Sequence, residues 1–186
     1  MPRIEPVTAP YSAALQQRFA RLVPPDTVPP AIFRAVARNE GLFLHLVDSG
    51  LLGPTGLLDR RVLPKPLREL LILRTCVAAG NDYEWHLHVD TISARMGLSA
   101  EQIEDTRSEV PSSGLWSAEQ LAAMRLADAL VRRLAVDDSL YAELRGHFDE
   151  PTLIEMTQLV GLYTGVAMLV ALARPGRDAY RANKRE

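Results

Sequence analysis

The sequence predicts an all-α protein, built as a single compact helical domain, and three observations support this fold class. Apolar residues recur at helical spacing along most of the chain, whereas no long stretch alternates polar and apolar residues as a strand would. Serine, asparagine and aspartate precede several of these segments and glycine follows them, as at helix ends. The chain has no repeat and no low-complexity tract, so we expect roughly seven to nine helices around one core.

Composition narrows the class of protein. A chain of 186 residues with 47% hydrophobic residues can bury a core without help from metals or disulfides. Its formal net charge of -2 supplies no broad positive field for nucleic acid or for an anionic membrane surface. The single cysteine, Cys76, excludes an intramolecular disulfide, and residues 1–8 lack the apolar core of a signal peptide. These features favour a cytoplasmic protein with neither nucleic acid nor a membrane as its partner.

The first elements are set by proline and glycine. The sequence Pro-Pro-Asp-Thr-Val-Pro-Pro at 24–30 interrupts any helix, because proline lacks an amide donor and disfavours helical geometry in the preceding residue. It separates an N-terminal arm, residues 1–30, from the helical domain, residues 31–186. Helices are expected at 31–37 and 42–51, and the second is ended by Gly50, Gly53, Pro54 and Gly56.

Two further segments, 67–79 and 83–96, are expected to form a helical hairpin. The first is rich in good helix formers, and Gly80 follows it where a helix C-terminus favours glycine. Asn81 or Asp82 can then cap the second helix, because a short side-chain oxygen accepts a hydrogen bond from a first-turn amide. The tight turn would place the two helices antiparallel.

The remaining helices follow the same signals. They are a short helix after Ser99, a long one from Ser117 to Leu134, a short one from Asp137 or Asp138 to Gly146, and a last one from Pro151 through Ala173. The apolar run 159–173 within the last helix is shorter than the roughly 20 residues that a membrane span needs. We therefore predict a buried central helix or an interface helix.

The hairpin carries the ionisable residues that suggest chemistry. Glu84 and His88 are four residues apart on one helix, so their side chains can meet on one face, and a carboxylate raises the pKa of a neighbouring imidazole. Glu69 lies on the preceding helix and faces inward if it shares the stripe of Cys76. Spacing alone leaves an alternative open, in which Glu69 pairs with a nearby arginine while Glu84 and His88 form an exposed surface pair.

A resemblance to a known family changes this balance. Glu69, Asn81, Glu84 and His88 follow the spacing Glu-x11-Asn-x2-Glu-x3-His, which is similar to the Glu-x11-Cys-x2-Cys-x3-His signature of the alkylhydroperoxidase D-like superfamily. The flanking runs Arg-Glu-Leu-Leu-Ile-Leu-Arg, Tyr-Glu-Trp and Met-Gly-Leu-Ser resemble its carboxymuconolactone decarboxylase branch. Asn81 and Glu84 replace both cysteines of the signature, so the resemblance implies the fold of the superfamily with a thiol-free site.

The resemblance implies a carboxymuconolactone decarboxylase-like enzyme, a lyase or isomerase that acts on a small carboxylated lactone or keto acid in aromatic compound catabolism. The expected catalytic residues are His88, which transfers the proton, Glu69, which orients it, and Glu84, its partner or a second acid. The expected substrate-binding residues are Tyr83, Asn81 and Arg74, as donors to a carboxylate or carbonyl. No cofactor and no metal are expected, and the superfamily implies a homo-oligomer, namely a dimer, a trimer or a hexamer.

Other functions stay open at this stage. One is a non-catalytic helical module that binds a ligand in an oligomer, and another is a peroxidase-related protein that lacks the paired thiols and retains only Cys76. Segment 93–107 has the outline of a helix-turn-helix, but its second helix carries several carboxylates that phosphate would repel. His86 and His88 point too far apart on a helix to share a metal ion, although Glu69, Glu84 and His88 together could hold one.

Overall fold

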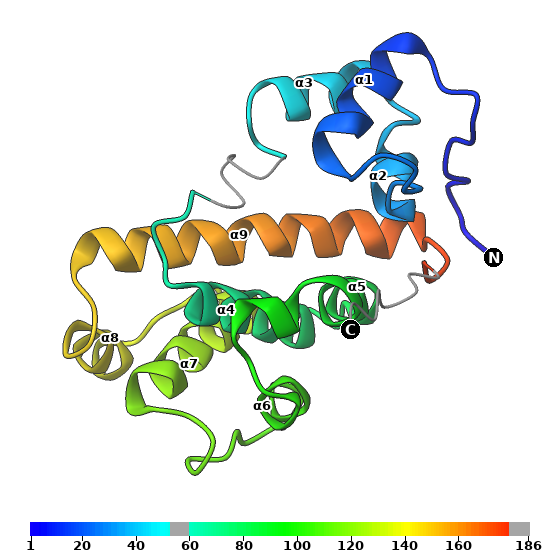
Figure 1. Ribbon diagram of the computed structural model, residues 1–186. Helices are drawn as coiled ribbons and strands as arrows, with labels where there is room; N and C mark the ends of the chain where they lie inside the picture. The colour runs from blue at the N-terminus through cyan, green and yellow to red at the C-terminus, as the bar shows by residue number, and fades with distance from the viewer. Residues whose placement is uncertain (53–59, 179–186) are drawn as a thin grey trace. The chain divides into compact units, whose positions relative to one another are not determined.

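The computed structural model describes residues 1–52 and 60–178, and every regular element in these two ranges is helical (Figure 1). The all-α prediction is therefore confirmed. The helices are α1 (Ala13–Leu22), α2 (Ala31–Val36), α3 (Glu40–Asp48), α4 (Lys65–Ala78), α5 (Asp82–Thr91), the 3-10 helix η2 (Ser93–Met96), α6 (Ala100–Asp105), α7 (Ala118–Arg133), α8 (Asp138–Arg145) and α9 (Glu150–Ala173).

These residues fall into two compact units. The first unit combines the chain up to Val62 with the segment that starts at Met168, and the second unit contains Leu63–Ala167. The prediction placed a boundary at residue 30, but α1 shares a hydrophobic core with residues beyond the proline-rich segment. Leu15 and Phe19 of α1 are buried together with Phe43 of α3. The arm is thus a helical part of the first unit, and its helix was not predicted.

Hydrogen bonds at the ends of its elements complete the first unit. The amides of Arg3 and Ile4 both donate to the Ala173 carbonyl at the end of α9. Pro30 precedes α2 and supplies no side-chain cap, so the carboxylate of Asp178 accepts from the Ala31 amide instead, at 3.0 and 3.1 Å. Free amides at a helix start need such an acceptor.

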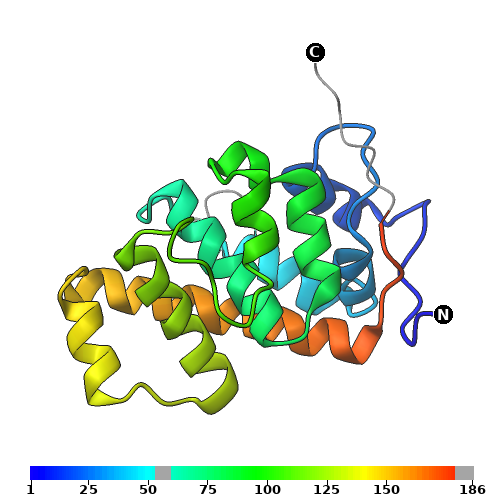
Figure 2. The same ribbon diagram turned by 90° about the horizontal axis from the view of Figure 1, so that it is seen from below.

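In the second unit α4 is the central element, and it packs against α5, η2 and α7, while α7 also packs against α8 (Figures 1 and 2). Four consecutive residues of α4, Leu70, Leu71, Ile72 and Leu73, have no exposed surface. A helix that is apolar all round in this way needs neighbours on all sides. The two ionisable side chains that flank this stretch, Glu69 and Arg74, are buried as well.

The hairpin and the elements before it differ from the prediction in detail. A single second hairpin helix was expected over 83–96, but α5 ends at Thr91, where Ile92 leaves the helical conformation with φ -126° and ψ -50°. The short helix η2 follows, and it turns Ser93 into the interior. Helix α3 ends at Asp48, and Gly50 follows it with a positive φ, whereas Gly53, Pro54 and Gly56 lie outside the described residues.

Helix α9 has 24 residues, from Glu150 to Ala173, so it begins well before the apolar run 159–173. It is long and apolar enough to cross a membrane by length and composition, which is weak evidence because core helices of soluble proteins meet the same test. Within the second unit its buried stripe comprises Leu153, Met156, Leu159, Val160, Tyr163 and Ala167. This stripe brings Tyr163 to the hairpin.

Candidate active site

The turn between α4 and α5 positions the two halves of the site. Gly80 has φ +64°, a conformation that glycine adopts without strain, and this lets the chain reverse after α4. Asn81 then caps α5, because its side-chain oxygen accepts a hydrogen bond from the Glu84 amide. Of the two caps that the sequence allowed, the structure uses Asn81. The result is an antiparallel hairpin in which Glu69 and His88 face each other.

Glu69 and His88 form a buried hydrogen-bonded pair. Glu69 Oε1 lies 3.0 Å from His88 Nδ1, and the exposed fractions of the two residues are 0% and 4%. The hydroxyl of Ser93, which is also fully buried, donates to the same Oε1 at 2.7 Å. The open alternative of an exposed surface pair therefore does not describe this structure.

The other imidazole nitrogen of His88, Nε2, faces α9 and the start of α5. It lies 3.3 Å from the hydroxyl of Tyr163 and 3.7 Å from Oε1 of Glu84. The two rings of His88 and Tyr163 meet edge to face with centroids 5.4 Å apart. The structure thus brings Glu69, Glu84 and His88 together, as the spacing suggested, and adds Tyr163 and Ser93.

Glu69 and His88 shift each other's pKa toward the charged forms. Burial alone would raise the pKa of Glu69, but the charge and hydrogen bond of His88, with help from Ser93 and Arg68, lower it below its ordinary value. Burial alone would lower the pKa of His88, but the charge and hydrogen bond of Glu69 and the charge of Glu84 raise it against a smaller opposing effect of Arg68. Each partner therefore stabilises the charged form of the other.

The single thiol of the chain lies close to these carboxylates without being activated by them. Burial, followed by the charges of Glu84 and Glu69, raises the pKa of Cys76 well above its ordinary value. The side chain is almost completely buried. A thiol that stays protonated and inaccessible is a poor nucleophile.

Arg74 lies outside this cluster, although it was expected to bind substrate. Its guanidinium, in a residue only 1% exposed, donates to both carboxylate oxygens of Asp128 on α7 and to the carbonyls of Thr106 and Ser108. Its hydrogen-bonding groups are engaged in joining α4 to α7 and to the loop after α6. The sequence could not reveal this, because Asp128 lies 54 residues further along the chain.

The other two predicted substrate-binding residues are on the first turn of α5. Asn81 is buried, and its Nδ2 has no hydrogen-bond partner among the described residues, so one amide donor remains available in the interior. Tyr83 is half-buried. Arg68 provides the cation next to the cluster, with NH1 4.0 Å from Glu69 Oε2.

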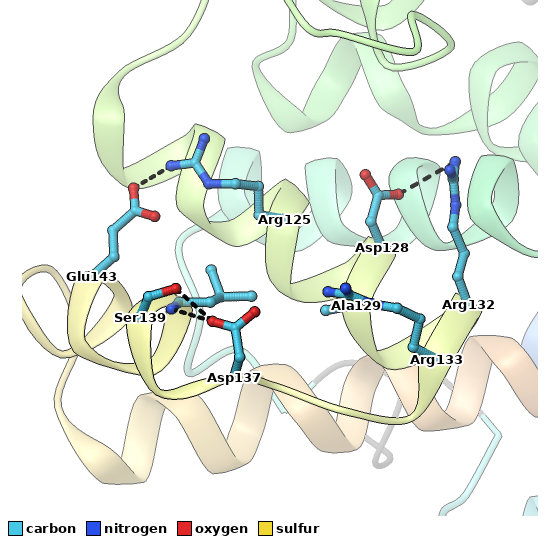
Figure 3. Close-up of a pocket in the computed structure, with 9 residues that line it drawn as sticks. Arg125, Asp128, Ala129, Arg132, Arg133, Asp137, Ser139 and Glu143 are labelled. Atoms are coloured by element: carbon cyan, nitrogen blue, oxygen red, sulfur yellow. Dashed lines mark hydrogen bonds and ion pairs between the residues drawn. The ribbon is translucent and has the colours of Figure 1, made fainter.

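A pocket of about 560 Å³ lies between α7 and α8, and Figure 3 shows the side chains that line it. Its charged lining consists of Arg125, Arg132, Arg133, Asp128, Asp137 and Glu143, so positive and negative groups balance. Arg125 pairs with Glu143 and Arg132 with Asp128. This pocket is separate from the cluster on α4, α5 and α9. Among the described residues, no group of three or more metal-binding side chains is arranged to hold an ion.

Ser93 and Tyr163 were missed from the sequence, for different reasons. Ser93 fell within a segment that was expected to be helical, and only the break at Ile92 turns it toward Glu69. Tyr163 is 75 residues from His88 and lies in an apolar run, where its hydroxyl was the only signal of a polar role. A buried tyrosine usually finds a polar partner, so that hydroxyl could have raised the question.

Comparisons with known proteins agree with this architecture. The model of the carboxymuconolactone decarboxylase family matches residues 54–129, a range that contains the whole α4–α5 hairpin. No curated protein matches the sequence. A cysteine-to-alanine variant of the debrominase Bmp8, in complex with 2,3,4-tribromopyrrole, superposes with a TM-score of 0.78 at 17% identity, over 95% of this chain and 92% of that one.

A second structure, of a protein of unknown function from Agrobacterium tumefaciens described as a candidate AhpD antioxidant defence protein, has a TM-score of 0.68 at 18% identity. The match covers 78% of this chain and 97% of the other. At these identities both likenesses establish the fold alone.

Proposed function

We propose that this chain, in which residues 54–129 match the carboxymuconolactone decarboxylase family, is an acid–base enzyme of lyase or isomerase type in which His88 transfers the proton. The observation that carries the proposal is the buried arrangement in which Glu69 is bonded to Nδ1 of His88 while Nε2 faces the Tyr163 hydroxyl and the Glu84 carboxylate. A carboxylate that orients an imidazole in this way prepares it for general acid–base catalysis. The substrate we propose is a small carboxylated lactone or keto acid.

In a decarboxylation, the bond between the substrate carbon and its carboxylate breaks, carbon dioxide leaves, and the electron pair moves onto a conjugated carbonyl. The Nε2 proton of the imidazolium then passes to that carbon, and His88 recovers a proton from solvent. An isomerisation would use the same nitrogen first as base and then as acid. The buried Asn81 amide supports the proposal as a donor to the carbonyl, and Arg68 as a cation for the carboxylate. Arg74 has no place in it.

Thiol chemistry is the weaker candidate. Both cysteine positions of the peroxidase signature are occupied, by Asn81 and Glu84, and a disulfide relay needs two thiols. Cys76 is buried, with a pKa raised by burial and by the neighbouring carboxylates. These features support an acid–base site over a peroxidase or another thiol-dependent enzyme.

The test is a screen of carboxylated lactones and β-keto acids with carbon dioxide release as the readout, followed by variants on the substrate that reacts. His88→Gln and Glu69→Gln should each lower turnover by about 100- to 10,000-fold, the range that general acid–base groups contribute. His86→Gln is the matched control, because His86 lies on the same helix, with Nδ1 bonded to the backbone carbonyl of Asp82 and its ring edge to face with Trp85. Near-full turnover in folded His88→Gln would refute the proposal.

A further inference from the structure

The two sides of the His88 ring offer different kinds of partner. On the Nδ1 side lies Glu69. Burial tends to raise the pKa of this carboxylate, but the charge and hydrogen bond of His88 lower it, so Glu69 is ionised and can only accept a hydrogen bond. Nδ1 must then carry the hydrogen of the 3.0 Å bond. In the neutral imidazole the lone pair therefore lies on Nε2.

The Nε2 side presents two groups with opposite preferences. The carboxylate of Glu84, at 3.7 Å, attracts a protonated Nε2 and so favours the imidazolium. The hydroxyl of Tyr163, at 3.3 Å, can donate to the lone pair of a neutral Nε2. When Nε2 is protonated, Glu84 can replace Tyr163 as the acceptor, but a carboxylate cannot replace it as a donor.

The environment keeps Tyr163 in the form that this role requires. Burial is the main cause that raises the pKa of the Tyr163 phenol, so it remains protonated. Its ring is fixed by the edge-to-face contact with His88, and the residue is 5% exposed. A phenol held in this way has one hydrogen to donate, and Nε2 is the acceptor that the structure places in front of it.

We infer that Tyr163 is a positioning residue that stabilises neutral, Nδ1-protonated His88, in competition with Glu84, which stabilises the imidazolium. The other charged groups that act on His88 are Glu69 and Arg68 on α4, and the Cys76 thiol of the same helix lies near Tyr163. Glu69 is bound at Nδ1, Arg68 opposes the imidazolium from the side of Glu69, and the Cys76 thiol stays protonated. The protonation of Nε2 therefore depends on Glu84 of α5 and Tyr163 of α9.

A consequence for catalysis rests on the proposed function. An enzyme that uses His88 as base and acid in one cycle needs both protonation states to be accessible. Glu69 and Glu84 favour the imidazolium, whereas a neutral Nε2 is favoured by Tyr163. Its hydroxyl would then set the pH at which the site changes from base to acid.

The experiment is a titration of His88 by NMR in protein labelled with ¹⁵N-histidine, with the His88 signal assigned by its loss in His88→Gln. Tyr163→Phe keeps the ring and removes the hydroxyl, so the His88 pKa should rise by about half to one unit, the equivalent of one hydrogen bond. Glu84→Gln should shift the His88 pKa in the opposite direction. Tyr141→Phe, which alters an exposed tyrosine on α8, should leave it unchanged.

A His88 pKa that is unchanged or lowered in Tyr163→Phe would overturn the inference. If that variant does not fold, global replacement by 3-fluorotyrosine gives a second measurement. Fluorine makes the phenol a stronger donor, so the His88 pKa should fall, and a rise would contradict the role of Tyr163.

The titration and the turnover assay separate the two proposals. Opposite shifts without turnover on any screened acid would uphold the role of Tyr163 and remove support for the decarboxylase chemistry. If turnover depends on His88 but the His88 pKa is unchanged in Tyr163→Phe, the decarboxylase chemistry is supported and the role of Tyr163 is refuted. If both hold, Tyr163→Phe should move the limb of the pH–rate profile that reports His88 upward in pH, with a smaller effect on the plateau.

Discussion

At the scale of single residues, the ion pair of Glu69 and His88 links the stability of the fold to pH. The Glu69 pKa is lowered below its ordinary value of 4.5, so its contribution to stability is present above that pH and is lost as the pH falls through the folded-state value. The His88 pKa is raised above 6.5, so its contribution is present below that pH and is lost as the pH rises through the folded-state value.

The free energy of unfolding should therefore contain a contribution from this pair that is largest between pH 4.5 and 6.5. Urea denaturation measured over a series of pH values, on the protein and on the double variant Glu69→Gln with His88→Gln, isolates that contribution as a difference. The difference should shrink on both sides of the window. A difference that keeps growing above pH 6.5 would show that the pair is not ionic in the folded protein.

Cys76 gives a second prediction at this scale. Because its thiol is buried and stays protonated, iodoacetamide should modify it slowly in the folded protein and rapidly after unfolding. Cys76→Ala should leave turnover close to that of the unaltered protein, while it removes a buried sulfur and lowers the free energy of unfolding moderately. Mass spectrometry follows the modification of Cys76, and the carbon dioxide assay follows the turnover of Cys76→Ala. Loss of activity in Cys76→Ala would instead support a thiol-dependent enzyme.

The sequence identified the charged members of the cluster but not its neutral ones. Helical spacing placed Glu84 beside His88, and the family signature singled out Glu69, since both depend on local order along one hairpin. Tyr163 approaches from another helix, and no local pattern encodes that approach. Arg74 had the right chemistry for binding an anion, but its buried partner Asp128 was invisible to spacing arguments.

At the scale of elements, the Arg74 and Asp128 ion pair joins α4 to α7. It is buried on the arginine side, and the guanidinium also satisfies the Thr106 and Ser108 carbonyls. Arg74→Met should lower the free energy of unfolding by about 3–5 kcal/mol, because it leaves a carboxylate and two carbonyls without their donor. Turnover per folded molecule should be retained, since Arg74 lies outside the His88 cluster.

Arg132→Met is the matched control for this prediction. Arg132 faces the same Asp128 at 3.7 Å but is 49% exposed, and exposed ion pairs contribute about 0–1 kcal/mol. Thermal and urea unfolding of both variants provide the comparison. If Arg74→Met is as stable as Arg132→Met but inactive, Arg74 belongs to the site after all.

Helix positions were more predictable than helix ends. The starts of α6 after Ser99 and of α7 at Ser117 were predicted to within one residue, and in the structure both serines cap their helices. The end of α5 was not predicted, because nothing in the local sequence marks Ile92 as a break. We attribute this break to a tertiary contact, the hydrogen bond from the buried Ser93 hydroxyl to Glu69.

At the scale of the whole molecule, we predict a homo-oligomer, on the basis of one face of α9. Within the second unit, this face carries the exposed Ile154 together with Gly161 and Gly165, which have no atoms near the position of an added side chain. The three residues share one side of the helix, where glycine permits close approach by a second helix. A dimer, a trimer or a hexamer would cover such a face.

Gly165→Leu tests this prediction, because no described atom lies within 4 Å of a Cβ added there and leucine favours helix more than glycine does. The variant should therefore fold. Light scattering should show that its oligomer dissociates at a higher protein concentration than the oligomer of the unaltered protein. Gly114→Leu, in a loop of the same unit, should have no such effect. A monomer at micromolar concentration before any substitution would refute the prediction outright.

The division into units was the largest feature that the sequence did not predict. The proline-rich segment 24–30 does interrupt the chain between α1 and α2, but such an interruption is not a boundary between cores. Whether α1 stands apart depends on what Leu15 and Phe19 contact, and their partners lie beyond the prolines. Composition cannot supply that information.

The closure of the first unit has a consequence for the order of events during synthesis. Its last hydrogen bonds, from Arg3 and Ile4 to Ala173 and from Ala31 to Asp178, need residues that leave the ribosome after the whole of Leu63–Ala167. Helix α2, which has no side-chain cap of its own, must therefore wait for Asp178, whereas Leu63–Ala167 is already able to assemble. The hydrogen bonds of the first unit are therefore completed only after Leu63–Ala167 has been synthesised.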